Sequence, residues 1–316
     1  MAWTKDVVRV RVPATSANLG PGYDALGLAL ALYDEVDAWV CASGLSIEIS
    51  GEGADLAGRG EDHLVVRAMR ASFAVTGSQP PGLGLRCVNR IPHGRGLGSS
   101  AAAIVAGILA ARALANHGAA ALPDAVLLGL AAEMEGHPDN VAACLRGGLT
   151  IAWTADGQPR MARLEPLPSV RPVICVAPEP VRTEVARSLL PDKVLHRDAA
   201  ANAGRSALLV AALTQLPGHT DALLAATQDW LHQDYRAAAM PQTGALVSGL
   251  RAAGIPAVVS GAGPSVLALL PERPDYRHHL DSLGSIVRET GIAWHISSLD
   301  VERQGARILR PELPPG

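Results

Sequence analysis

The feature that most constrains the fold is a glycine-rich loop that leads directly into a helical stretch of small residues. Its residues are Pro92-His93-Gly94-Arg95-Gly96-Leu97-Gly98-Ser99-Ser100-Ala101-Ala102. Glycine lets the backbone turn sharply and approach a ligand, and a helix start presents unpaired N–H groups to an anion. The loop matches neither G-x-x-x-x-G-K-[S/T] nor a dinucleotide G-x-G-x-x-G that opens a βαβ unit. We therefore predict a phosphate site of another kind, although a plain strand-to-helix turn capped by Ser99 would need similar residues.

Length and charge limit the possible environment and partners. The chain has 316 residues, enough for two domains with a core each, and its net charge of −3 indicates no general attraction to nucleic acid or to an anionic membrane. The most apolar stretch, at 101–111, is too short to span a bilayer, and the first residues are typical of a strand rather than a signal peptide. The cysteines lack the spacing of a zinc site or a disulfide framework. These features predict a soluble, cytoplasmic protein with reduced thiols.

Hydrophobic periodicity predicts strands and helices in alternation. In the first half, strands are expected at 8–12, 45–49 and 83–88, and helices at 62–75, 99–116 and 123–134. In the second half, a strand is expected at 171–177 and helices at 183–190, 199–216 and 221–231. Turn formers at 156–159 and 166–168 separate the halves. We therefore predict one domain over 1–165, a second over 166–305, and a loose tail over 306–316.

Three separate motifs resemble those of the GHMP kinases. The glycine loop is similar to the nucleotide loop of this superfamily, which includes galactokinase, mevalonate kinase and homoserine kinase. Residues 12–27 (VPATSANLGPGYDALG) resemble its first motif in the form that homoserine kinases use, and residues 260–266 (SGAGPSV) resemble its third. The resemblance implies an α+β fold of two domains, an N-terminal α+β domain and a C-terminal ferredoxin-like domain, with the active site in the cleft between them.

The resemblance implies ATP as co-substrate and Mg²⁺ as the metal ion. The triphosphate would lie on the loop 92–102, where backbone N–H groups bind phosphate oxygens. Mg²⁺ prefers hard oxygen ligands, and the family supplies a loop serine and a glutamate. These correspond to Ser99 or Ser100 and to Glu133, with Glu135 as the competing candidate. Two residues apart on a helix, the glutamates point to different faces.

A further motif, EGHPDNV at 135–141, holds three side chains suited to orienting a polar substrate. On the residues alone it could be a proline-containing helix boundary with an Asx cap. The resemblance places His137 at the substrate and Asp139 or Asn140 near the attacking hydroxyl. The catalytic set is then Asn140, Asp139, Glu133 and Ser100. We assign positioning to Asn140 and leave the general base open, because mevalonate kinase uses an aspartate where homoserine kinases have an asparagine.

The resemblance also predicts side chains for both charged ends of an amino-acid substrate. Arg187 and Arg236 would bind the carboxylate with Thr183 alongside, since a guanidinium suits two-point contact with a carboxylate. Asn18 and Asp24 would receive the polar head. By spacing alone, each arginine would be interpreted as a surface charge.

The function expected from the resemblance is phosphorylation of L-homoserine to O-phospho-L-homoserine in threonine biosynthesis, by a homodimer. Free L-threonine and mevalonate are alternative substrates, although mevalonate lacks the amine that Asp24 would bind. A non-catalytic sensor of nucleotide or amino acid is an alternative of another class. Three positions depart from the family pattern, namely Tyr23 in place of Phe, Ala201 in place of His, and His63 in place of a nucleotide-contacting Asn.

Overall fold

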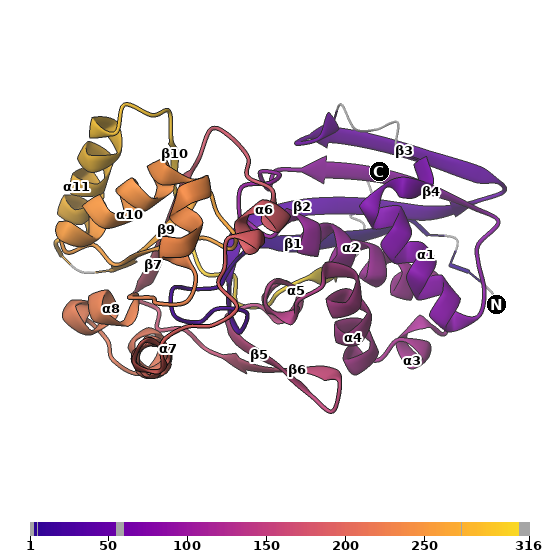
Figure 1. Cartoon of the computed structure of the whole chain (residues 1–316). Helices are drawn as coiled ribbons and strands as arrows, with labels where there is room; N and C mark the ends of the chain where they lie inside the picture. Colours follow the sequence, from indigo (N-terminus) through magenta and orange to yellow (C-terminus); the bar gives the residue numbers. More distant parts are fainter. Residues whose placement is uncertain (1–2, 5, 55–59, 273, 310–316) are drawn as a thin grey trace.

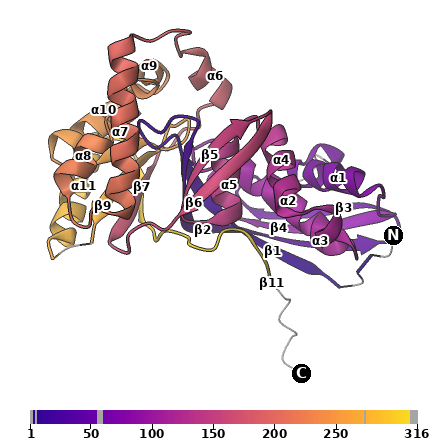
Figure 2. The same ribbon diagram turned by 90° about the horizontal axis from the view of Figure 1, so that it is seen from below.

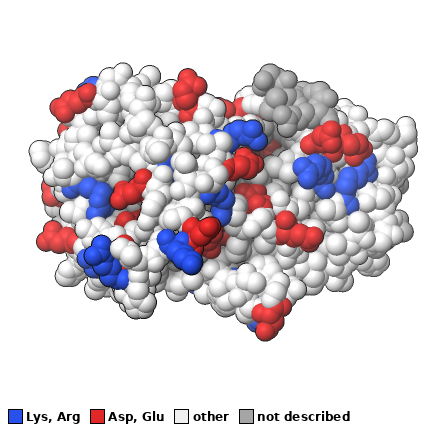
Figure 3. All heavy atoms as spheres, viewed as in Figure 1, with Lys and Arg blue, Asp and Glu red and all other residues white. Residues whose placement is uncertain are grey.

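The computed structural model describes residues 3–4, 6–54, 60–272 and 274–309. Its two parts lie side by side, each built on its own sheet (Figure 1). Within the described residues, no helix combines the length and the apolar character that crossing a membrane requires. On the face shown in Figure 3, acidic and basic side chains are interspersed rather than gathered by sign. This agrees with the small net charge of the chain.

The first part contains a seven-stranded sheet with the order β11-β1-β2-β4-β3, to which β5 and β6 are added through β2. Its strands are β1 (Val8–Ala17), β2 (Leu26–Cys41), β3 (Gly44–Gly51), β4 (Gly82–Asn89), β5 (Leu149–Ala155), β6 (Gln158–Leu164) and β11 (Arg307–Leu309). Only β3 and β4 pair in parallel among these described strands. The first five helices lie over one face of this sheet (Figure 2). They are α1 (Leu64–Thr76), α2 (Ser99–Leu114), α3 (Gly118–Ala121), α4 (Asp124–Glu135) and α5 (Pro138–Arg146).

Helix α2 is the centre of this part because it is buried nearly all round. Its small residues permit close packing against the sheet and against α1. A Cβ on Gly107 would lie 2.4 Å from the carbonyl oxygen of Val65, so only glycine fits at this contact. The apolar run after the glycine loop is therefore the packing surface that anchors the loop.

The second part is a four-stranded sheet with helices. Its strand order is β10-β7-β9-β8, with β7 (Val170–Val176), β8 (Ala257–Val259), β9 (Val266–Pro271) and β10 (His295–Ser298). The accompanying helices are α6 (Thr183–Ser188), α7 (His196–Thr214), α8 (Thr220–Ala226), α9 (Gln233–Arg236), the 3-10 turn η2 (Ala237–Ala239), α10 (Pro241–Ala252) and α11 (Tyr276–Glu289).

The two parts share a hydrophobic core. Side chains alternate along β9, so Leu267 and Leu269 join the core of the first part while Val266 and Leu270 belong to a second cluster with α10 and α11. One face of the second sheet therefore continues the first core. This differs from the expectation of a separate core for each domain.

The structure corrects several sequence-based expectations. The turn formers at 156–159 make the tight β5–β6 hairpin inside the first sheet, with Asp156 at φ 53°, and the expected boundary at 165/166 falls between β6 and β7. The helix expected over 221–231 ends at Ala226, where Thr227 bonds back to the helix. The expected loose tail is wrong for 307–309, because β11 pairs with β1 and forms the edge of the first sheet; residues 310–316 lie outside the described residues. Strands β2, β5 and β6 have no counterpart among the predicted elements.

Candidate active site

The glycine loop links β4 to α2, and tertiary contacts hold it on both sides. Gly94, Gly96 and Gly98 have φ of 66°, 73° and 69°, a region that favours glycine. A Cβ on Gly96 would lie 2.1 Å from the Ser260 carbonyl oxygen, and one on Gly98 would lie 1.9 Å from Thr15 Oγ1. The N-cap of α2 is Gly98, without a side-chain cap bond, so Ser99 is not the cap. Hence the hydroxyls of Ser99 and Ser100 are not used to begin the helix.

Arg95 and Ser260 connect this loop to the second part. The Arg95 guanidinium donates to the carbonyls of His93, Ala177 and Pro178 at 2.8, 3.0 and 2.6 Å. Ser260 Oγ donates to the Gly96 carbonyl at 2.7 Å. Arg95 therefore stabilises the loop through three hydrogen bonds to backbone carbonyls.

A cavity of about 140 Å³ lies over the loop, between the two parts of the molecule. It brings together most of the side chains that the sequence predicted, from five separate segments. Its lining residues are Asn18, Gly94, Gly96, Leu97, Gly98, Ser99, Ser100, Glu135, His137, Asp139, Asn140, Val181, Thr183, Arg187, Gly261, Ala262 and Gly263. We call it the polar cavity.

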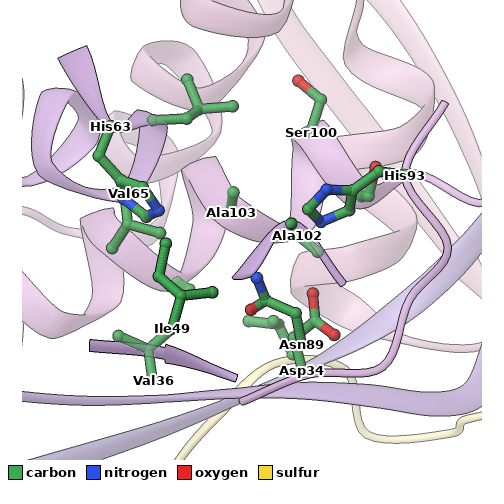
Figure 4. A pocket seen from close by; sticks show the side chains of 15 residues that line it. Asp34, Val36, Ile49, His63, Val65, Asn89, His93, Ser100, Ala102 and Ala103 are labelled. Atoms are coloured by element: carbon green, nitrogen blue, oxygen red, sulfur yellow. The ribbon is translucent and has the colours of Figure 1, made fainter. Parts of the chain in front are cut away.

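A second cavity, of about 220 Å³, adjoins the first at the start of α2 (Figure 4). Much of its wall is aliphatic, from Val36, Ile49 and Val65 to Ala102 and Ala103, and both cavities include Ser99 and Ser100. Its polar side chains come from several sides in Figure 4, with His63 at the left, His93 at the right, and Asn89 and Asp34 below the centre. We call it the apolar cavity, and its volume and lining suit a flat heterocycle.

Glu135, and not Glu133, reaches the glycine loop. Ser100 Oγ donates to Glu135 Oε2 at 2.6 Å, and Glu135 lines the polar cavity. Burial raises the pKa of Glu135 to about 7, opposed by the Ser100 hydrogen bond and reinforced by Asp139. Glu133 is exposed on α4 and is not among the lining residues. The placement of Glu133 therefore speaks against the metal-ligand role predicted for it, because α4 turns its side chain away.

The turn at 137–140 starts α5, and its three polar side chains, His137, Asp139 and Asn140, line the polar cavity. Asp139 is 1% exposed, and burial raises its pKa to about 6. One of its oxygens accepts the backbone N–H of Asn140 at 2.8 Å. Thr15 Oγ1 donates to Asn140 Oδ1 at 2.8 Å, which leaves the Asn140 amide N–H groups for a ligand. Burial, followed by the charge of Arg187, lowers the pKa of His137.

Arg187 and Asp24 form an ion pair beside the polar cavity. Arg187 donates to Asp24 Oδ1 at 2.5 Å, to Asp24 Oδ2 at 3.3 Å and to the Tyr23 hydroxyl at 3.0 Å. Asn18 Oδ1 accepts the backbone N–H of Asp24 at 2.9 Å, and both residues have positive φ. The first motif thus folds into a tight loop that presents a carboxylate to α6.

Arg236 is fully buried, contrary to the surface charge that its spacing alone suggested. Its guanidinium lies 5.3 Å from the ring centroid of Tyr23, and NH1 donates to the Gly261 carbonyl at 3.3 Å. Within the part of the chain that is described, its Nε and NH2 have no hydrogen-bond partner and it forms no ion pair. Arg236 is not itself a lining residue of the polar cavity, although Gly261 is.

Sequence reasoning missed Thr15, His232 and Ser260 as parts of the site. Thr15 and Ser260 stand inside the first and third motifs, so their position within a motif was the available signal. His232 begins the segment that contains Arg236, but its burial could not be seen from the sequence.

Both parts of the chain are similar to known proteins. The chain matches the family described as GHMP kinases N terminal domain over residues 63–148, and GHMP kinases C terminal over residues 209–292. It is 56% identical to a homoserine kinase of Streptomyces coelicolor over 98% of this chain and 96% of that protein. It is 51% identical to a homoserine kinase of Clavibacter michiganensis over 95% of this chain and 93% of that protein.

A solved structure supports the same assignment. The homoserine kinase of Cytophaga hutchinsonii superposes with a TM-score of 0.82 at 27% identity, covering 97% of this chain and 98% of that one. The predicted two-domain α+β fold and the resemblance carried by the three motifs are both confirmed. This chain belongs to the homoserine kinase family of the GHMP kinases.

Proposed function

We propose that the protein phosphorylates the hydroxyl of L-homoserine with ATP, giving O-phospho-L-homoserine and ADP for threonine biosynthesis. The observation that carries the proposal is the meeting of an apolar and a polar cavity at Ser99 and Ser100. A nucleoside in the first would direct its phosphates over the helix start toward a substrate in the second. Phosphoryl transfer depends mainly on such positioning and on neutralising charge. The curated relatives reported above are named homoserine kinases.

We assign the nucleotide to the loop 92–102 and the apolar cavity. The base would lie between the aliphatic side chains, and the phosphates would accept backbone N–H groups at the start of α2. His63 lines the cavity where the family commonly has asparagine, so its imidazole would replace an amide at the nucleoside.

We propose that Mg²⁺ is held by Ser100 and Glu135, with Ser99 as a further hydroxyl. The fit rests on hard oxygen donors 2.6 Å apart and on a carboxyl whose pKa is raised by burial, with no nearby cation among the described residues lowering it. The described residues hold no cluster of three or more His, Cys, Asp or Glu for a metal, and Mg²⁺ commonly uses one or two protein carboxylates with substrate phosphates. When bound, the ion would neutralise charge on the phosphates.

We assign orientation of the attacking hydroxyl to Asn140 and acceptance of its proton to Asp139. Thr15 fixes the Asn140 amide so that its N–H groups face the cavity. An amide is not a base at neutral pH, whereas a carboxylate with a pKa of about 6 is ionised there and still basic enough to accept a proton. We therefore propose Asp139, rather than Asn140, as the general base.

We propose that Arg187 and Arg236 bind the substrate carboxylate and that Asp24 binds the ammonium group. Thr183, Asn18 and His137 would complete the polar surroundings. Arg187 donates a hydrogen bond to Asp24 Oδ1. A zwitterion can exchange this one ion pair for two, because its carboxylate meets the arginine while its ammonium meets the aspartate.

Turnover measurements with a panel of hydroxy acids test the proposal. ADP release would be coupled to an optical signal with L-homoserine, L-threonine and mevalonate, each at matched ATP and Mg²⁺. We expect turnover with L-homoserine in clear preference to the others. Turnover only with L-threonine would move the assignment to the alternative substrate, and ATP binding without any turnover would favour the sensor.

We also propose, from the family resemblance, that the enzyme is a cytoplasmic homodimer. Light scattering behind size-exclusion chromatography measures the mass. A mass near twice 32.7 kDa is expected, and a mass near 32.7 kDa across micromolar concentrations would contradict it.

A further inference from the structure

A buried row of polar groups runs from α9 to the loop that follows β1. His232 lies at its centre, and its side chain is 0% exposed. Its Nε2 is 2.7 Å from the Gly20 carbonyl oxygen, and its Nδ1 is 3.2 Å from NH1 of Arg236. Gly20 stands between Asn18 and Asp24, so the imidazole connects two elements of the proposed substrate site.

The partners of His232 allow only one arrangement of its proton. A backbone carbonyl can only accept, so Nε2 must carry the hydrogen. A guanidinium can only donate, so Nδ1 must present its lone pair to Arg236. A proton on Nδ1 would face a guanidinium 3.2 Å away. The ring is therefore neutral and protonated on Nε2.

Asp229 fixes the backbone of this segment without taking the imidazole proton. Its carboxylate accepts the backbone N–H groups of Leu231, His232 and Gln233 at 3.0, 3.0 and 2.7 Å. It approaches His232 Nε2 no closer than 3.7 Å, beyond hydrogen-bond distance. Burial lowers the pKa of His232, which agrees with a neutral ring, although the charge of Asp229 acts in the opposite direction.

The bonds on Arg236 divide its guanidinium into a held side and a free side. NH1 donates to His232 Nδ1 and to the Gly261 carbonyl. The Nε and NH2 groups, which form the edge that a carboxylate can bind in two-point contact, are buried and have no partner among the described residues. Fixing NH1 therefore fixes the direction of the free edge.

We propose that His232 is a positioning residue for substrate recognition: its neutral Nε2–H tautomer is anchored on Gly20, and its Nδ1 holds Arg236 so that the Nε/NH2 edge meets the substrate carboxylate. The proposal rests on the carboxylate-binding role proposed for Arg236. It assigns no contact between His232 and substrate.

Two substitutions separate the two ring nitrogens. In His232→Asn, the amide oxygen lies near the former Nδ1 and can still accept from Arg236, while the bond to Gly20 is lost. In His232→Gln, the amide N–H lies near the former Nε2 and can still donate to Gly20, while Arg236 NH1 loses an acceptor. His278→Gln on the exposed part of α11 is the control.

The kinetic test compares KM for homoserine with KM for ATP. We expect His232→Gln to raise KM for homoserine about tenfold, the loss expected for a hydrogen bond to a charged donor, with kcat and KM for ATP within about twofold. His232→Asn should stay within about threefold of wild type. In an Arg236→Ala background His232→Gln should add nothing. Equal effects of the two substitutions, or an undiminished effect without Arg236, would overturn the proposal.

The tautomer is tested independently of turnover. Nitrogen-15 NMR of the ligand-free protein, with the His232 signals identified by their loss in His232→Asn, should show a protonated Nε2 and an unprotonated Nδ1 at neutral pH. An imidazolium or an Nδ1–H tautomer would refute the proposal even if the enzyme phosphorylates homoserine. Failure to turn over homoserine, with the expected tautomer present, would instead refute the proposed function.

Discussion

Replacing Glu135 with glutamine is expected to stabilise the metal-free protein and to abolish most of its activity. Among the described residues, Ser100 is the only hydrogen-bond partner of this carboxylate, and burial raises its pKa from 4.5 to about 7. Because the folded-state pKa lies above the unfolded one, the folded protein binds this proton more tightly. The resulting stabilisation is complete below pH 4.5 and is lost as the pH rises through 7.

The free-energy cost of ionising Glu135 follows from the difference between its pKa values in the folded and unfolded states. At about 1.4 kcal/mol per pH unit, an ionised Glu135 costs the folded state up to about 3 kcal/mol at pH 8. Glutamine keeps the shape without the charge, so Glu135→Gln should unfold at higher denaturant than wild type at pH 8 in EDTA. The difference in unfolding free energy between Glu135→Gln and wild type should decrease toward pH 5. If the side chain is a ligand of Mg²⁺, kcat/KM should fall by at least about 100-fold.

Glu133→Gln is the matched control, since it makes the same substitution two residues earlier on α4 at an exposed position. Its free energy of unfolding should change by less than about 0.5 kcal/mol, and its turnover should stay near wild type. Urea unfolding at pH 5, 6.5 and 8 in EDTA, with turnover measured over a Mg²⁺ titration, gives both quantities. Loss of turnover in Glu133→Gln with full activity in Glu135→Gln would refute the reasoning.

Three further substitutions test other parts of the site. Arg187→Ala should raise KM for homoserine at least about tenfold, because it removes a charged partner and leaves Asp24 unpaired; steady-state kinetics would contradict this by showing a change in kcat alone. Gly98→Ala should weaken ATP binding at least about tenfold and lower the melting temperature, because its Cβ would lie 1.9 Å from Thr15 Oγ1 at a φ of 69°; unaltered calorimetric titration with ATP would argue against the need for glycine. Ala103→Leu should fill the apolar cavity and raise KM for ATP while KM for homoserine stays constant, and equal changes in both would place the nucleoside elsewhere.

Local residue types were sufficient to predict the conformation of the glycine loop and of the helix that follows it. The sequence alone determined that 94–98 turns sharply and that 99–114 is a helix, because positive φ and helical periodicity are properties of a short segment. It also determined the proposed substrate turn at 137–140, since those residues are adjacent. The three motifs were enough to identify the superfamily.

Only the tertiary structure decided which side chains meet. Glu133 and Glu135 share a helix and a residue type, and the packing of α4 on the loop alone selects the one that reaches Ser100. Arg236 looks like a surface charge until α9 packs against the loop containing Gly20 and buries it. The pairing of β11 with β1 joins residues about 300 positions apart, which no local pattern can encode. Backbone conformation is a local property, whereas the burial of a side chain and its hydrogen-bond partners depend on segments that only the fold brings together.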